Sequence, residues 1–104
     1  MFIRFMKTKR AINLDNFDEI TILLDREWGK INSYMVVAKR YADKVTSVSG
    51  TLNVGGTYSD GECFVVIEKY SPATDKDAEK KANEFYDRLQ YAWINRLDIF
   101  EVDN

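Results

Sequence analysis

The spacing of apolar residues changes at Thr74, and this change constrains the fold more than any other feature of the chain. Before it, short runs of β-branched and aromatic residues alternate with polar residues, as in half-buried strands. After it, apolar residues recur at steps of three and four, the pattern of one amphipathic helix. We therefore expect a single α+β domain over 1–104, with strands in about 1–70, a helix in about 74–96 and an acidic tail at 97–104. The helical pattern is carried by Ala78, Ala82, Phe85, Leu89, Ala92 and Trp93.

The alternating part of the chain predicts about five or six short strands. The clearest covers 62–70 and follows the tight-turn pair Asp60-Gly61. Segments 19–24 and 34–39 are expected to form a hairpin with a long tip that carries Trp28. Weaker strand candidates are 2–6, 11–14 and 45–54, the last of which precedes a glycine-rich loop at 55–61.

We expect the strands to form one antiparallel meander sheet, because short consecutive strands usually pair with their neighbours in the chain. The helix would cover the apolar face of this sheet with Phe85, Leu89 and Trp93, while Tyr91 and Ile94 point to a flank or outward. The order of elements is similar to that of pleckstrin-homology-type rolls, in which a C-terminal helix closes a curved meander. This resemblance of layout implies a curved sheet and no particular function.

The chain contains no histidine and one cysteine. Imidazole is the commonest general base and metal ligand near neutral pH, so its absence argues against hydrolase triads and the usual zinc sites. Cys63 lies inside the predicted strand 62–70, which is typical of a structural buried thiol in a reducing compartment. The acids Asp15, Asp18 and Glu19 lack the spacing of a calcium loop, so a solvated turn is favoured. We expect a cytoplasmic protein that is not an enzyme, with no catalytic residue, cofactor or metal.

Aromatic residues supply the leading functional hypothesis. The chain has 6 Tyr, 6 Phe and 2 Trp, too many for the interior of 104 residues, so some should be exposed, as at binding hot spots. We expect a small protein–protein interaction module that self-associates or acts as an inhibitor or adaptor. Its expected partner-binding residues are Trp28, Tyr34, Tyr91 and Ile94, and packing on the flanks of the core is the alternative for each.

Charge patterning supplies a second hypothesis. The formal net charge of −2 gives no overall attraction to nucleic acid, but residues 1–10 carry only bases and residues 98–104 only acids. Attraction between these two ends within the fold is the simplest interpretation. The alternative is a single-stranded nucleic-acid or anion binder, with the cations Arg4, Lys7, Lys9, Arg10, Lys39 and Arg40 beside exposed aromatic rings. No membrane partner is expected, because the apolar stretch at 1–6 is far too short to span a bilayer.

Overall fold

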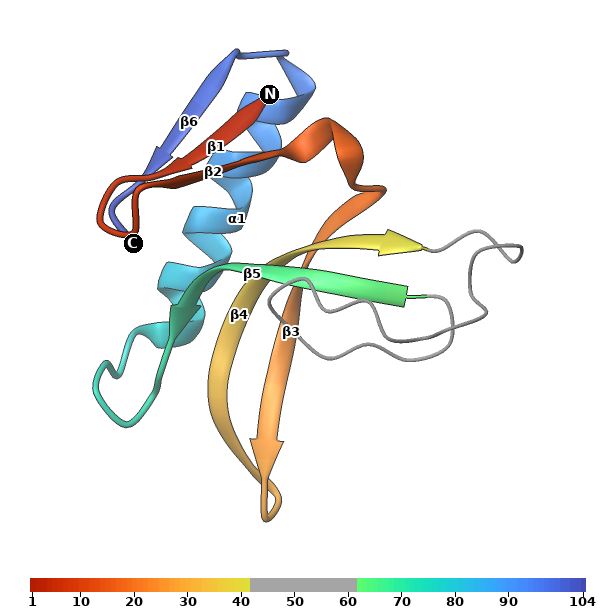
Figure 1. The fold of residues 1–104 in the computed structure, drawn as a ribbon. Helices are drawn as coiled ribbons and strands as arrows, with labels where there is room; N and C mark the ends of the chain where they lie inside the picture. The colour runs from red at the N-terminus through yellow and green to blue at the C-terminus, as the bar shows by residue number, and fades with distance from the viewer. Residues whose placement is uncertain (42–61) are drawn as a thin grey trace.

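The computed structural model describes residues 1–41 and 62–104, which form six strands, one α-helix and one 3₁₀ turn (Figure 1). The weak strand predicted at 45–54 and the glycine-rich loop at 55–61 lie outside the described residues. In chain order the elements are β1 (Phe2–Phe5), β2 (Arg10–Asn13), the 3₁₀ turn η1 (Leu14–Asn16), β3 (Glu19–Glu27), β4 (Lys30–Tyr41), β5 (Glu62–Tyr70), α1 (Ala78–Ile94) and β6 (Ile99–Val102).

The strands form two three-stranded sheets, so the prediction of a single antiparallel meander is wrong, although the α+β class is confirmed. One sheet has the order β2-β1-β6 and the other the order β3-β4-β5. The turn η1 separates β2 from β3, and β1 takes β6 as its second neighbour in a parallel pair. A parallel pair requires a long crossover, which here is most of the chain. This pair also departs from the rolled meander that the pleckstrin-homology-type layout implies.

The hairpin of β3 and β4 is longer, and its turn tighter, than the sequence predicts. The strands stay paired as far as Glu27 and Lys30, which leaves only Trp28 and Gly29 in the turn. Both turn residues have positive φ, 54° and 77°, as in the type I′ turns that join two-residue hairpins. Because β5 pairs with β4 only over residues 34–41, the hairpin projects beyond the third strand as a two-stranded ribbon (Figure 1).

The core lies where α1 meets the two sheets. The buried face of the helix carries Ala82, Phe85 and Leu89 at steps of three and four, as predicted. The Phe85 ring contacts the Phe100 ring edge to face, with centroids 5.7 Å apart. Full burial of a large apolar side chain contributes roughly 1.5–3 kcal/mol to the stability of the fold. Because the helix and strands of both sheets contribute to this one cluster, the cluster holds both sheets to the helix. Its members from the strands include Ile3, Phe5 and Val102 of the first sheet and Ile20, Val36, Ala38 and Ile67 of the second.

The helix begins at Ala78, four residues later than expected, because the chain first forms a turn. The Thr74 hydroxyl and backbone N–H both donate to the Ser71 carbonyl, and Asp75 Oδ1 accepts a hydrogen bond from the Asp77 N–H at 2.9 Å. The Asp75 carboxylate also pairs with Lys81 in the first turn of the helix. These contacts fix the turn that leads into the helix, and Asp77 at its N-cap makes no side-chain capping hydrogen bond.

The helix ends in a Schellman motif and the acidic tail then forms β6. The Leu97 N–H donates to the Ala92 carbonyl and the Arg96 N–H to the Trp93 carbonyl, with Arg96 at φ 56°. After this reversal β6 runs parallel to β1, which places Glu101 opposite Arg4. The two oppositely charged ends of the chain are therefore neighbours in the fold, as their sequences predict.

Candidate functional site

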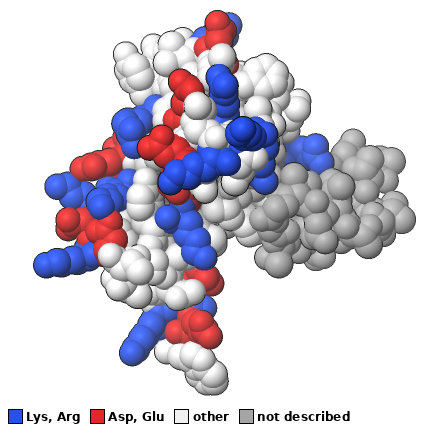
Figure 2. All heavy atoms as spheres, turned by 60° about the vertical axis from the view of Figure 1, so that its left-hand side comes forward, with Lys and Arg blue, Asp and Glu red and all other residues white. Residues whose placement is uncertain are grey.

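Trp28 occupies the tip of the projecting hairpin. Its side chain is 94% exposed, more than any other large apolar side chain in the described part of the chain. A positive φ costs a residue other than glycine about 1 kcal/mol, and Trp has no local hydrogen bond to offset that cost. The tip lies at the bottom of Figure 2, where uncharged atoms end the molecule and charged side chains lie above them on the face in view. Trp28 therefore stabilises neither the turn nor the core.

Tyr91 and Ile94 form a second exposed apolar site at the C-terminal end of α1. Their side chains are 68% and 70% exposed, and their spacing of three residues puts them on the same side of the helix. The end of α1 and the turn of the β3–β4 hairpin lie at opposite ends of the molecule (Figure 1). The structure thus does not bring Trp28 together with Tyr91 and Ile94.

Tyr34, the fourth predicted partner-binding residue, is half-buried and packs against the core. Its hydroxyl donates a hydrogen bond to Glu79 Oε2 at 3.2 Å, which links β4 to the first turn of α1. Desolvation, and next the hydrogen bond to Glu79, raise the pKa of the Tyr34 hydroxyl above its ordinary value of 10.0. The surroundings of Tyr34 thus give this residue a role in the fold.

The six cations of the alternative patch are divided between the two sheets. Lys39 and Arg40 lie on β4, whereas the other four belong to β1, β2 and the turn between them. Three of these, Arg4, Lys9 and Arg10, line a groove of about 610 Å³ on the β2-β1-β6 sheet, and Lys7 lies outside its lining. Figure 2 shows Lys and Arg side chains interspersed with Asp and Glu on the face in view, without one broad basic area.

The groove combines an apolar floor with cations. Side chains alternate along β1, so that Ile3 and Phe5 are buried while Phe2 and Arg4 face outward. Phe2 lies opposite Ile99 of β6, and these two side chains are 51% and 54% exposed. The Arg10 guanidinium lies 4.8 Å from the Phe5 ring centroid, in cation–π contact, and so covers the core at the end of β1. The remaining lining residues are Met6, Lys9 and Ala11.

Sequence reasoning missed Met6 and Ile99 as members of a binding surface. Alternation within residues 2–6 already places Met6 on the side of Phe2 and Arg4, and this signal was sufficient to find it. Ile99 joins them only through the parallel pairing of β6 with β1, which has no local signal.

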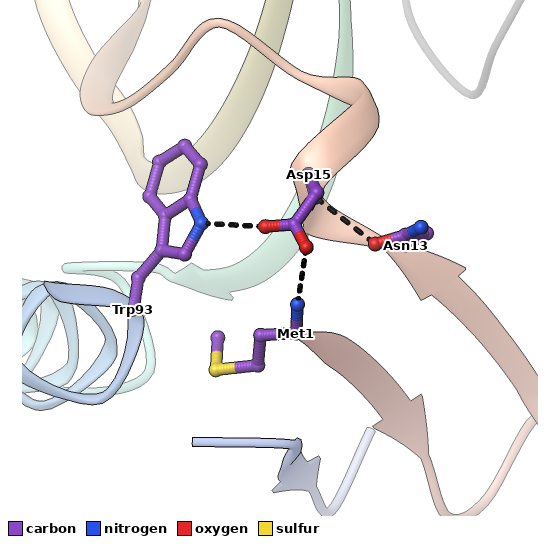
Figure 3. Close-up of polar contacts among 4 residues, drawn as sticks. All are labelled: Met1, Asn13, Asp15 and Trp93. Carbon is purple, nitrogen blue, oxygen red and sulfur yellow. Dashed lines mark hydrogen bonds and ion pairs between the residues drawn. The ribbon is translucent and has the colours of Figure 1, made fainter. Parts of the chain in front are cut away.

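Asp15 is a structural junction (Figure 3). Its Oδ2 accepts a hydrogen bond from the N-terminal ammonium of Met1 at 2.8 Å, and its Oδ1 accepts one from Trp93 Nε1 at 3.0 Å. The ammonium first, and then the indole, hold the pKa of Asp15 below its ordinary value of 3.8. Of the two tryptophans, Trp93 therefore stabilises the fold through its N–H, whereas Trp28 belongs to the surface.

The other two acids of the first cluster also have partners. Asp18 Oδ2 accepts from the Tyr41 backbone N–H at 2.6 Å, and Glu19 accepts from the Tyr41 hydroxyl. The Asp18 N–H donates in turn to the Lys39 carbonyl at 2.8 Å. These contacts tie the start of β3 to the end of β4, a more specific role than that of the solvated turn expected from the sequence.

Within 1–41 and 62–104, no three His, Cys, Asp or Glu side chains lie close enough together to hold a metal ion. Cys63 is buried on β5, at the position predicted for it. No helix in the described part of the chain is both long enough and apolar enough to cross a bilayer.

Comparison with known proteins gives no match to a family model, a curated protein or a solved structure.

Proposed function

We propose that this protein is a small non-enzymatic interaction module that binds a protein partner through the tip of the β3–β4 hairpin. The observation that carries the proposal is Trp28, which is 94% exposed at a positive-φ position of a two-residue turn. Such turns favour Asn, Asp or Gly at the first central position, because these residues adopt positive φ at little cost. An indole here adds nothing to folding, so binding is the physical role that remains for it.

The two paired strands of the β3–β4 hairpin hold Trp28 in a fixed position. Cross-strand pairing of Glu27 with Lys30 holds the turn, so the indole is offered on paired strands and loses little backbone freedom on binding. Tryptophan is among the residues most enriched at interface hot spots, where truncation costs about 2 kcal/mol or more. Arg26, Glu27 and Lys30 are exposed around it and would form the polar rim of such a contact. The partner would supply an apolar pocket for the ring.

Single-stranded nucleic acid is the weaker candidate. Two of the six cations lie on β4, away from the four near β1 and β2. Acidic side chains also lie among the bases on the face shown in Figure 2, which would repel a phosphate backbone. The groove on the first sheet retains three cations, so an oligothymidine strand is a competing ligand for that groove.

The test compares three proteins as bait in cells of the source organism: wild type, Trp28→Asn and Ile94→Asn. Asn suits the turn, and the Ile94 variant makes a similar apolar-to-polar change on a 70% exposed side chain at the other end of the molecule. We expect a protein retained by wild type and Ile94→Asn but lost with Trp28→Asn. Binding of that purified partner should weaken by roughly 30-fold in the Trp28 variant.

Tryptophan fluorescence and sedimentation complete the test. In a Trp93→Phe background the emission reports Trp28, and it should shift to shorter wavelength when the partner covers the ring. Sedimentation of wild type and Trp28→Asn over a wide concentration range shows whether the partner is a second copy of the chain. If no partner and no self-association depends on Trp28, the proposal is wrong.

A further inference from the structure

We propose that the β2-β1-β6 sheet has a second binding surface, where the groove and the open edge of β2 take an extended acidic segment of a partner protein. In this segment acidic residues alternate with apolar ones. The surface is separate from the β3–β4 hairpin, so the inference stands independently of Trp28.

The groove has the size and the lining of a binding surface. Its volume of about 610 Å³ lies within the range of roughly 300–1,000 Å³ common for ligand sites. Phe2, Met6 and Ile99 are each between 41% and 54% exposed and lie in this one lining. Contiguous exposed apolar side chains rimmed by polar ones mark interaction sites on soluble proteins. An apolar side chain that the segment extends over Ala11 of β2 would cover the part of this floor nearest that strand.

The charge of the lining selects an anionic ligand. Arg4, Lys9 and Arg10 contribute to the groove, and no Asp or Glu belongs to its described lining. The whole chain has a formal net charge of −2, so this positive character is local. Attraction to acidic residues would orient the ligand, while burial of apolar area would supply most of the affinity.

The strand β6 shows which kind of segment this sheet accepts. It has the sequence Ile-Phe-Glu-Val, is flanked by Asp98 and Asp103, and pairs with β1, whose one charged side chain is Arg4. In that pairing Ile99 lies opposite Phe2, and Glu101 opposite Arg4, so apolar meets apolar and acid meets base. The acidic, alternating β6 is thus an internal example of the proposed ligand.

The edge of β2 is where such a segment can pair. β2 is the terminal strand of its sheet, and no other strand of the described residues pairs with its outer side. Addition of a strand to an open edge gains main-chain hydrogen bonds, and alternate side chains then fill neighbouring pockets. The added strand would lie three strand spacings, about 14 Å, from the acids of β6, beyond effective repulsion in salt.

The same groove suits nucleic acid less well. Stacking of successive bases requires several open aromatic faces, yet of the two lining rings Phe2 is exposed and Phe5 is 2% exposed beneath Arg10. A phosphate backbone that crosses the sheet would also pass the exposed Glu101.

The test uses a fluorescein-labelled peptide with the sequence of residues 98–104, Asp-Ile-Phe-Glu-Val-Asp-Asn, and a control peptide with Lys at its three acidic positions. Fluorescence anisotropy should show binding of the acidic peptide and not of the control. Lys9→Glu with Arg10→Glu should weaken binding by at least about tenfold. Lys76→Glu with Lys80→Glu makes the same charge change at exposed positions near the start of α1 and should leave the affinity unchanged.

Two further measurements locate the peptide and keep the test valid. Amide chemical shifts should change at residues 9–13, and Trp28→Asn should bind the peptide as wild type does. Because Arg10 covers Phe5, the charge-reversed protein is compared with Arg4→Gln and Lys9→Gln, which keep that contact and should each weaken binding severalfold.

Four results would overturn the proposal. The first is that both peptides bind equally or that neither binds. The second is chemical-shift changes confined to residues 99–102, which would mean that the peptide exchanges with β6. The third is tighter binding of an oligothymidine strand, which would mean a nucleic-acid site, and the fourth is self-association that is lost on charge reversal of Lys9 and Arg10, which would mean that the ligand is a second copy of the chain. Each leaves the Trp28 proposal untouched, since that rests on the hairpin.

Discussion

The indole N–H of Trp93 donates a hydrogen bond to Asp15 Oδ1 at 3.0 Å and joins two residues that are 78 positions apart in the chain. Asp15 belongs to η1, which directly follows β2 in the chain, and Trp93 belongs to the last turn of α1. The same carboxylate accepts from the Met1 ammonium, so three separate segments meet at one side chain (Figure 3). This contact fixes the end of the helix beside the first sheet.

Replacement of Asp15 by Asn should lower thermal stability near neutral pH, because a neutral amide loses the attraction to the ammonium. The pKa of Asp15 is lowered in the folded protein, so its stabilising effect is complete above the unfolded value of 3.8 and is lost as pH falls through the folded pKa. The difference in melting temperature between wild type and Asp15→Asn should therefore be constant around pH 6 and shrink below about pH 4. Thermal melts across this range measure it.

The difference between the two melting temperatures cancels the effects of the other carboxyl groups, because those groups titrate in both proteins. Trp93→Phe provides the structural control, since it deletes the indole donor and keeps the carboxylate. A difference that stays the same down to pH 2 would show that Asp15 is not held as a carboxylate by these contacts.

Trp28→Asn should make the isolated protein more stable while it weakens partner binding. Asn adopts the positive φ of the type I′ turn more readily than Trp, and the 94% exposed indole has little packing to lose. We expect a gain of about 0.5–1 kcal/mol in the free energy of unfolding, measured by urea denaturation. A loss of stability would mean that the indole packs on the protein in solution.

Arg96→Gly should stabilise the protein at the end of α1. Arg96 has φ 56° at the position of the Schellman motif where glycine is most frequent. Relief of that conformation should add about 0.5–1 kcal/mol to the free energy of unfolding. Arg96→Ala is the matched control, because it also removes the charge but keeps a Cβ, and it should show no such gain.

Ser33→Ala should leave the stability unchanged or raise it. Ser33 on β4 is fully buried, and its Oγ has no hydrogen-bond partner among the described residues. Removal of an unsatisfied buried hydroxyl avoids a desolvation cost of about 1–3 kcal/mol, against which the lost packing of one oxygen is small. Chemical denaturation of both proteins tests this expectation, and marked destabilisation by Ser33→Ala would show that the hydroxyl is hydrogen-bonded in solution.

The candidate surfaces were partly predictable. Exposure of Tyr91 and Ile94 follows from helical geometry once Phe85 and Leu89 face the core, and the structure confirms it. The tight turn at Trp28 was missed because tryptophan is a poor type I′ residue, so the usual Asn-Gly signal is absent. The sequence did not predict the groove as one surface, because its lining residues come from three different strands and the turn between two of them.

The sequence alone determined the local elements, whose signals lie within a few neighbouring residues. Alternation predicts β5 at the observed residues Glu62–Tyr70, and steps of three and four predict the buried stripe of α1. Only the tertiary structure decided that the strands within 1–41 and 62–104 form two sheets, that β6 lies parallel to β1, and that the Asp15–Trp93 contact forms. These depend on which distant segments bury the most apolar area together, and that energy belongs to the assembled core and not to any one segment.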